Sequence, residues 1–345
     1  LNKFRISFRP GARLIFLLIQ TLFLAYLVQA QSYDLLLKGG HVLDAKNEID
    51  GVYDLAITGN QIAAVQKNIP VNQATQVVNA TGLFVTPGLI DLHAHLYWGT
   101  SEGDYLNDSY NALPPDGFTL KYGVTTAVDA GGSGWKSFEK FKEQTIDRSK
   151  TRVKALLNIV GGGMRGDPDE QSITDMDPKL TAMRVMEFDE IVGIKLAHFK
   201  THSWEPVRLA VEAGRLSDVP VMVDFGRADP PLSIRQLFLE ELRPGDIFTH
   251  CFADSTLRES IVDENGKLKA FAKEAVERGI IMDVGHGAGS FRWYVAIPAL
   301  EQGLKPQTIS TDLHTGSMNG GMKNQLNVMS KFLNMGMSIQ EVIEA

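Results

Sequence analysis

The feature that most constrains the fold is an alternation of two kinds of segment that begins near residue 85. Short apolar runs alternate with longer segments of helical periodicity, which is typical of a parallel sheet built from strand–helix units. Residues 85–345 are therefore predicted to form an α/β, TIM-like (β/α)8 barrel, with a doubly wound open sheet as the alternative. The eight runs are "FVTPGLIDLHAH", "TTAVDAG", "VKALLNIV", "IVGIKLA", "VPVMVDF", "IFTHCF", "IIMDVGH" and "TISTDLH".

A small β unit is predicted ahead of the barrel, over residues 31–84. Short β-rich runs in this part of the chain are separated by "KGG", "TGN" and "ATG" turns. At the other end, the chain stops at "SIQEVIEA", inside what the pattern predicts as the last helix of the barrel.

The first thirty residues have the pattern of a signal peptide. Four basic residues precede an apolar stretch over residues 14–28, and "VQA" offers a cleavage site after Ala30. The alternative is an uncleaved anchor helix, but the stretch is shorter than the ~20 residues needed to span a bilayer. The mature protein is therefore expected to be exported, periplasmic or secreted, without stable insertion in a membrane.

The formal net charge is −7 for the whole chain and −11 without residues 1–30, which hold four basic and no acidic residues. An acidic surface argues against nucleic acid as a partner. Cys251 is the one cysteine, so no intramolecular disulfide forms even in an oxidising compartment. It adjoins His250 on the opposite face of a strand, which argues against a nucleophilic Cys–His pair. The oligomeric state, homo-oligomer included, is left open.

Six of the eight predicted strands end in, or just before, a residue that binds metals or moves protons. In this fold the active site lies at the carboxyl ends of the strands. Buried polar groups without partners cost several kcal/mol, so their convergence on one rim indicates a site rather than isolated core residues. They are His93 and His95 on the first strand, Lys195 on the fourth, Asp224 on the fifth, His250 on the sixth, His286 on the seventh, and Asp312 and His314 on the eighth.

His93 and His95 make the metal hypothesis specific. Residues two apart on a strand share a face, so both imidazoles are predicted to point the same way. Two neutral imidazoles and a carboxylate leave a divalent ion such as Zn²⁺ an open position for water. The ion lowers the pKa of that water, and we expect Asp312 to take its proton and pass it to the leaving group. Such a site, facing a polarised carbonyl, predicts hydrolysis.

Six segments, taken in order, resemble the amidohydrolase superfamily, and more narrowly its dihydroorotase-like and D-aminoacylase-like branch of amidohydrolase/deacetylase metallohydrolases. They are "VTPGLIDLHAHLYWG", "VGIKLAH", "PVMVDFG", "LRPGDIFTHCF", "DVGHGAGSF" and "ISTDLHTG". The resemblance covers residues 33–345. Relatives usually continue with strands that complete the small β unit, so the resemblance implies a C-terminally truncated chain, and a first residue that is Leu rather than Met agrees with this.

Carried over by position, the resemblance implies a site with one or two divalent ions, most simply zinc. His93, His95 and Asp312 would hold the more buried ion. Lys195 would be carboxylated by CO₂ on its amine, and the resulting carbamate would bridge to the second ion. A buried lysine is readily deprotonated and therefore open to reaction with CO₂. The alternative is an ordinary lysine that pairs with Asp312 or Asp224.

The fifth strand departs from the pattern of the family. Where relatives supply a histidine to the second ion, "VMVDFG" offers Asp224. A carboxylate binds Zn²⁺ with harder character and one more negative charge. Three interpretations stay open: Asp224 replaces the histidine, the nearby His198 does so, or the second site is weak and one metal suffices. We favour Asp224. His250 matches the remaining second-metal ligand of the family.

Three further residues are candidates for substrate contact. His286 lies among glycines that permit close backbone approach to a ligand, and it either touches the substrate or orients a carboxylate. His314 shares a face with Asp312 and has the same two interpretations. Arg165, in the loop "GGGMRG", is a candidate to hold a substrate carboxylate, with an exposed loop arginine as the alternative. The acidic segment that follows argues against a dinucleotide site at this loop.

The residues and the resemblance together predict a metal-dependent hydrolase of a small amide, such as an N-acyl amino acid, an acylated hydroxy acid or a cyclic amide. Export weighs against cytosolic pyrimidine synthesis, so a deacetylase or scavenging amidase is preferred to a dihydroorotase. A lactonase, esterase or phosphotriesterase would use the same ligands. A non-catalytic metal-binding relative is the alternative from another class.

Overall fold

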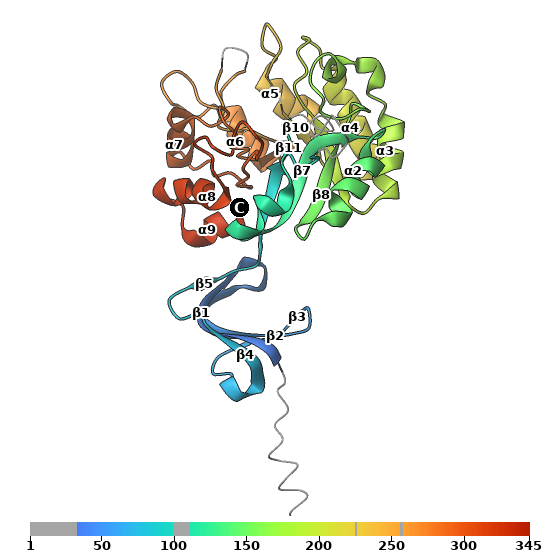
Figure 1. Ribbon diagram of the computed structural model, residues 1–345. Coiled ribbons are helices and arrows are strands. Elements are labelled where there is room, and N and C mark those ends of the chain that lie inside the picture. The colour runs from blue at the N-terminus through green and yellow to red at the C-terminus, as the bar shows by residue number, and fades with distance from the viewer. Residues whose placement is uncertain (1–32, 99–110, 225, 256–257) are drawn as a thin grey trace, which may run out of the picture. The chain divides into compact units, whose positions relative to one another are not determined.

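The computed structural model describes residues 33–98, 111–224, 226–255 and 258–345. The chain divides into two compact units, Leu1–Pro87 and Gly88–Ala345. Figure 1 shows a sheet in the first unit, and strands with helices around them in the second. The predicted signal peptide, residues 1–30, lies outside the described residues. Within the described part of the chain, every helix is too short or too polar to cross a bilayer.

The first unit is a sheet of five strands. They are β1 (Tyr33–Asp44), β2 (Ile49–Thr58), β3 (Gln61–Gln66), β4 (Ala74–Asn79) and β5 (Phe84–Val85). β1 lies at the centre, antiparallel to β2 and parallel to β4 and β5. The buried carboxylate of Asp54 accepts hydrogen bonds from Lys38 Nζ at 2.6 Å and from the backbone N–H of Ile69 at 2.8 Å. These five strands are the small N-terminal β unit that the turn pattern predicts.

The second unit is built on a parallel sheet of seven strands in chain order. The strands are β6 (Leu89–Ala94), β7 (Val124–Gly134), β8 (Arg152–Asn158), β9 (Ile191–Leu196), β10 (Val221–Val223), β11 (Ile247–Phe248) and β12 (Ile281–Met282). The helices are α2 (Phe138–Gln144), α3 (Pro178–Glu187), α4 (Glu205–Ser217), α5 (Ile234–Gln236), α6 (Ala270–Glu277), α7 (Trp293–Glu301), α8 (Gln325–Asn334) and α9 (Ile339–Glu344). A π-helical turn, Leu237–Glu241, continues α5. The predicted alternation of strands and helices around a parallel sheet is confirmed.

The eighth predicted strand is not a regular strand. Residues 308–313 make isolated parallel bridges instead, between Asp283 and Thr308 beside β12 and between Ala94 and Leu313 at β6. The segment therefore lies between the last and the first strand, and the sheet curls back on itself. The described residues form a partial TIM-like barrel with seven strands, where the sequence pattern predicts eight.

Side-chain acceptors supplement the backbone pairing at this seam. The backbone N–H of Thr311 donates to the carboxylate of Asp91 at 3.0 Å. On the other side, the backbone N–H of Gly285 donates to the hydroxyl of Ser310 at 2.9 Å. Backbone bonds also cross the seam, from Val284 N–H to Thr308 O at 3.0 Å and from Asp312 N–H to His93 O at 2.7 Å, so the backbone remains paired without a continuous strand.

The inside of the curled sheet is filled by one small hydrophobic cluster to which each of the seven strands contributes. Lys195 on β9 also points into this interior, because its Nζ lies 3.4 Å from the sulfur of Met222. The cluster consists of Leu92, Val128, Ala130, Leu156, Val192, Met222, Ile247 and Ile281.

A β-bulge on β9 sets the direction of this lysine. Ala155 on β8 pairs with Ile191, but the next residue, Leu156, pairs with Gly193, so β9 carries one extra residue. A Cβ on Gly193 would lie 2.7 Å from the side chain of Leu156, which belongs to the interior cluster. The bulge therefore turns Gly193, and two residues later Lys195, toward the inside of the barrel.

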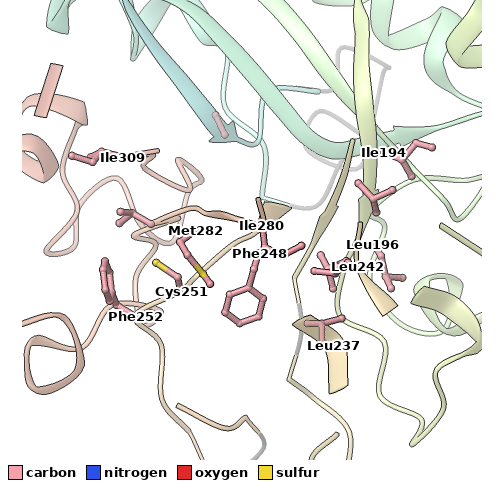
Figure 2. Close-up of a cluster of buried hydrophobic side chains, with 14 of the residues drawn as sticks. Ile194, Leu196, Leu237, Leu242, Phe248, Cys251, Phe252, Ile280, Met282 and Ile309 are labelled. Atoms are coloured by element: carbon pink, nitrogen blue, oxygen red, sulfur yellow. The ribbon is translucent and has the colours of Figure 1, made fainter. Parts of the chain in front are cut away.

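The main hydrophobic core lies between the sheet and its helices. Figure 2 shows part of it, with Phe248 and Met282 from the strands close to the side chain of Cys251. Cys251 is 1% exposed, and burial raises the pKa of its thiol well above the ordinary value. The thiol is thus a core group, and the protonated form that burial favours is a poor nucleophile.

Candidate active site

The carboxyl ends of the strands and the loops that follow them enclose a cavity of about 410 Å³. A volume of this size suits a small-molecule ligand. Six residues that the sequence singles out line it: His95, His198, Asp224, His250, Asp312 and His314. The other lining residues are Asn111, Met164, Gly226, Arg227, Ala253, Asp254, Ser255, Arg258, Ala288, Gly289, Ser290 and Arg292.

The first group of ligand atoms comes from His93, His95 and Asp312. The Oδ1 atom of Asp312 lies 3.0 Å from Nε2 of His95 and 3.6 Å from Nε2 of His93. Among the described residues, this is the one set of three or more His, Cys, Asp or Glu side chains whose ligand atoms all lie within 4.8 Å of one another. All three residues are buried. The barrel therefore brings together the residues that were predicted to hold the more buried ion.

The hydrogen-bond partners of His93 determine which of its nitrogens faces the site. The hydroxyl of Thr249 donates to Asp283 at 2.6 Å, so its oxygen can only accept from Nδ1 of His93 at 2.8 Å. Burial lowers the pKa of His93 to about 3, so the ring is neutral. A neutral ring with its hydrogen on Nδ1 presents a bare Nε2 lone pair, which is the form that binds a metal.

A second group of ligand atoms gathers on Asp224, directly after β10. Its Oδ2 lies 3.4 Å from Nε2 of His250 and 3.4 Å from Nε2 of His198. Nδ1 of His250 donates to the carbonyl oxygen of Gly285 at 2.5 Å, which leaves its Nε2 directed at this carboxylate. A proton or a cation between Nε2 and the carboxylate oxygen would satisfy both atoms.

His198 is held between two carboxylates. Its Nδ1 donates to Oε2 of the buried Glu170 at 2.9 Å, while its Nε2 faces Asp224. Burial alone would lower the pKa of His198, but the hydrogen bonds with Asp224 and Glu170 raise it to about 9. Burial would raise the pKa of Asp224, but the imidazoles of His250 and His198 hold it well below its usual range. Asp224 and His198 therefore lie side by side. Either residue is placed to bind the second ion where relatives use a histidine.

Lys195 lies between the two groups. Its side chain is fully buried, and its Nζ is 3.3 Å from Nε2 of His93. In the described part of the chain it forms no ion pair within 4.0 Å, so the alternative of a lysine paired with Asp312 or Asp224 is not observed. Burial lowers the pKa of the amine, despite the attraction of these carboxylates. The amine is thus driven toward its neutral form.

Backbone strain is concentrated at this cavity. Eight described residues other than glycine have a positive φ, and four of them line the cavity: Asn111 (φ 57°), His198 (φ 58°), His250 (φ 54°) and Asp312 (φ 51°). Side chains with a Cβ disfavour this left-handed region, and such residues cluster where function requires a particular side-chain direction. Three of the four carry candidate ligand atoms.

Three predicted substrate-contact residues have different placements. His314 lines the cavity, and its Nδ1 accepts from the backbone N–H of Gly316 at 3.0 Å, which leaves Nε2–H directed at Asp312, 3.7 Å away. His286 does not line the cavity; its Nδ1 donates to Gly287 O at 2.9 Å and its Nε2 accepts from Lys331 Nζ at 2.6 Å.

Arg165, the expected holder of the substrate carboxylate, does not line the cavity either. The backbone N–H of Met164 donates to Gly131 O at 3.0 Å, and this bond turns the side chain of Met164 to the cavity. The next side chain, that of Arg165, is exposed at the surface.

Sequence reasoning missed several residues that shape the site. Thr249 and Asp283 set the tautomer of His93, and their positions beside His250 and at the end of β12 were a usable signal. Glu170 lies in an acidic loop without strand or helix periodicity, so no pattern singles it out. The cavity arginines, Arg227, Arg258 and Arg292, come from loops whose course depends on the tertiary fold.

Comparison with known proteins identifies the family. A crystal structure of a dihydroorotase matches with a TM-score of 0.78 and 32% identity, over 90% of this chain and 80% of that chain. A deacetylase from Agrobacterium fabrum is 36% identical over 301 residues, which cover 85% of this chain and 71% of that protein. The chain belongs to the amidohydrolase superfamily. The amidohydrolase lies in the dihydroorotase-like deacetylase branch that its motifs resemble. A comparison with protein-family models found no match.

Family membership establishes the class of this amidohydrolase as a hydrolase of carbon–nitrogen bonds other than peptide bonds. A crystal structure of an adenine deaminase matches equally well, with a TM-score of 0.78 and 30% identity over 90% of this chain and 81% of that chain. One barrel thus carries differently named activities, and the substrate has to be inferred from the site rather than from the fold.

Proposed function

We propose that this amidohydrolase removes an acyl group from a small N-acylated substrate, such as an N-acyl amino acid, in a reaction that depends on zinc. The observation that carries the proposal is the meeting of His93, His95 and Asp312 beside a cavity of about 410 Å³. The name of the Agrobacterium fabrum relative supports deacylation, and the dihydroorotase neighbour supports a cyclic amide as the second substrate class.

The residues present fit a divalent ion. His93 is locked in the tautomer with a bare Nε2, and the ionised Asp312 supplies a carboxylate oxygen within 3.6 Å of it. His95 keeps its buried Nδ1 without a hydrogen-bond partner, although buried polar atoms are nearly always satisfied. When bound, the ion would act as a Lewis acid and lower the pKa of its water, with Asp224, His250 and His198 available to hold a second ion.

We propose that Lys195 is carboxylated in the functional protein. Its buried amine is adjacent to Nε2 of His93 and has no carboxylate partner within 4.0 Å among the described residues. The nitrogen lone pair forms a bond to the carbon of CO₂, one carbon–oxygen π bond breaks onto oxygen, and the amine loses a proton to water. The product is an anion where two groups of ligand atoms meet. Carbon NMR of protein equilibrated with labelled bicarbonate would show the carbamate, and a spectrum that Lys195→Met leaves unchanged would contradict this assignment.

Asp312 is the proton carrier in this proposal. Burial would raise its pKa, but the imidazoles of His93 and His95 hold it far below the usual range, so the carboxylate is ionised. It can accept a proton from the attacking water and deliver it to the leaving amine. His314 directs its Nε2–H at the same carboxylate and helps to hold its orientation.

The test is turnover by zinc-loaded protein of N-acetyl amino acids, dihydroorotate and adenine, compared with lactones and aryl phosphotriesters. We expect the N-acetyl compounds to be hydrolysed, and Asp312→Asn to lower kcat by ~10²–10⁴-fold. Asp189→Asn is the matched control, because Asp189 is exposed and does not line the cavity. Exclusive turnover of lactones or phosphotriesters would favour the esterase alternative, and no turnover with metal fully bound would favour a non-catalytic protein.

We also propose that the protein is exported. The basic and apolar segments of residues 1–30 support a cleaved signal peptide. Expression of the chain with this segment, followed by N-terminal sequencing of the periplasmic fraction, should give a mature protein that begins at Gln31. Recovery of the intact N-terminus in the cytoplasm would contradict the proposal.

A further inference from the structure

The cavity has two walls of different chemistry. One wall carries the ligand groups, with His95, Asp224, His250 and Asp312. Another part of the lining comes from two loops, one after β11 and one between β12 and α7. Both loops contribute arginines, Arg258 and Arg292, and neither arginine has a role in the mechanism derived above.

Arg258 is a buried cation without an anionic partner. It is 7% exposed, and its Nη2 donates to the carbonyl oxygen of Thr249 at 2.8 Å. The guanidinium lies over the ring of Phe248, 4.6 Å from the ring centroid. Within the described residues no carboxylate lies within 4.0 Å of it, and Asp254, which lines the same cavity, does not pair with it.

A charge in this position is costly unless an anion compensates for it. Buried charges in proteins are normally paired, and a guanidinium has five N–H donors, of which a single carbonyl uses one. Burial lowers the pKa of Arg258 to about 10, against the attraction of Asp224, yet the group remains charged at neutral pH. The remaining donors are available at the cavity for a planar anion, which a guanidinium binds through two parallel hydrogen bonds.

The neighbouring backbone is built to hold the arginine stem in place. Gly226 follows β10 with φ +121°, a conformation that disfavours residues with a side chain. A Cβ added there would lie 2.5 Å from Cβ and 2.7 Å from Cγ of Arg258. Glycine therefore permits the stem of Arg258 to pass directly over the chain, and a larger residue would displace the guanidinium from the cavity.

We propose that Arg258, with Arg292 beside the same cavity, binds a carboxylate of the substrate while the scissile amide faces the ligand groups. This inference rests on the proposed function and narrows it. The substrate is then an N-acyl amino acid or another small acylated carboxylate, rather than a neutral amide or a purine. Specificity for the acid belongs to Arg258 and not to the exposed Arg165.

The experiment separates binding from turnover. N-acetylalanine and its uncharged carboxamide, each in both enantiomers, are titrated by calorimetry into zinc-loaded protein that carries Asp312→Asn, so that hydrolysis during the titration is slowed. We expect the acid to bind more tightly than the carboxamide. Addition of Arg258→Gln should weaken binding of the acid by ~30-fold or more and leave the carboxamide within ~3-fold, because only the acid loses a charged partner.

Two further variants keep the result interpretable. Gly226→Ala retains the guanidinium but displaces it, so it should also remove the preference for the acid even if Arg258→Gln folds poorly. Arg235→Gln, on an exposed arginine of α5, is the control and should bind both compounds as before. Equal binding of acid and carboxamide before Arg258 is changed, an unchanged preference after the change, or loss of the preference in Arg165→Gln would each overturn the proposal. These outcomes do not depend on turnover, which tests the proposed function separately.

Discussion

His93 presents Nε2 to the ligand group because Thr249 occupies its other nitrogen. The hydroxyl accepts from Nδ1 at 2.8 Å and donates to Asp283 at 2.6 Å, and all three groups are buried. Thr249→Val keeps the shape of the side chain but removes both hydrogen bonds. The Nδ1–H of His93 is then left without its acceptor, and Asp283 loses one of its donors.

The magnitude follows from these contacts. A buried polar group left unsatisfied costs about 1–3 kcal/mol, so the free energy of unfolding of the metal-free protein should fall by about 2 kcal/mol. Groups that orient metal-binding histidines typically contribute 10–100-fold to metal affinity. Asp283 Oδ2 already lies 3.6 Å from Nδ1 and can move toward it, which recovers part of the loss. We therefore expect a decrease in zinc affinity of ~10-fold, at the lower end of that range.

The assay is competition for zinc between the protein and a fluorescent chelator, with thermal unfolding of the metal-free protein measured in parallel. Thr249→Ser is the matched control, because it retains the hydroxyl and both of its hydrogen bonds. It removes one methyl group, which costs about 1 kcal/mol of stability. If Thr249→Val binds zinc as tightly as Thr249→Ser, then the hydroxyl does not determine the tautomer of His93. The argument for a preformed ligand group would be refuted.

Three other predictions follow from the same geometry. Glu170→Gln should lower the pKa of His198 in metal-free protein from its raised value of about 9, as NMR titration would show. The folded-state pKa is raised above the ordinary 6.5, so wild type should have a higher free energy of unfolding than Glu170→Gln, with the full difference present below pH 6.5. This difference should disappear as pH rises through about 9, and a difference independent of pH would contradict the assignment. Gly163→Ala should lower the unfolding free energy by about 2 kcal/mol or more, because φ is +85° and a Cβ would lie 2.3 Å from a backbone carbonyl oxygen. Gly162→Ala, whose Cβ would meet only Arg165 at 3.6 Å, should cost much less, and equal losses of melting temperature would count against this reasoning. Removal of metal by a chelator should lower the melting temperature, and zinc at ~100 times its Kd should restore about 2.7 kcal/mol, whereas an unfolding curve insensitive to both would argue against a metal centre.

The strands were predictable because each one is a local apolar pattern. Seven of the eight apolar runs contain a parallel strand of the sheet, in chain order. The eighth run, "TISTDLH", has the same composition but its N–H groups partly bond side chains, such as the carboxylate of Asp91. Nothing in the run itself shows this, because Asp91 lies on the first strand, more than two hundred residues earlier.

The candidate ligands were predictable for a related reason. The carboxyl ends of parallel strands meet at one edge, so residues such as His93 and Asp312 can be assigned to the same place without knowledge of any distance. The same reasoning placed His286 and Arg165 near the substrate. In the structure, His286 forms a hydrogen bond with Lys331, and the side chain of Arg165 is exposed at the surface. Position along the chain predicts the rim of the barrel but not the direction of each side chain on it.

The sequence by itself determined the kinds of chemical group available, namely imidazoles, carboxylates and one lysine at strand ends, and the order in which they follow one another. Only the tertiary structure decided which atoms face each other. A bulge on β9 turned Lys195 inward, Thr249 set the tautomer of His93, and the loop after β11 carried Arg258 to the cavity. The physical reason is that periodicity reports the burial of one segment, whereas distances across a barrel depend on register and on loops that fold against distant parts of the chain.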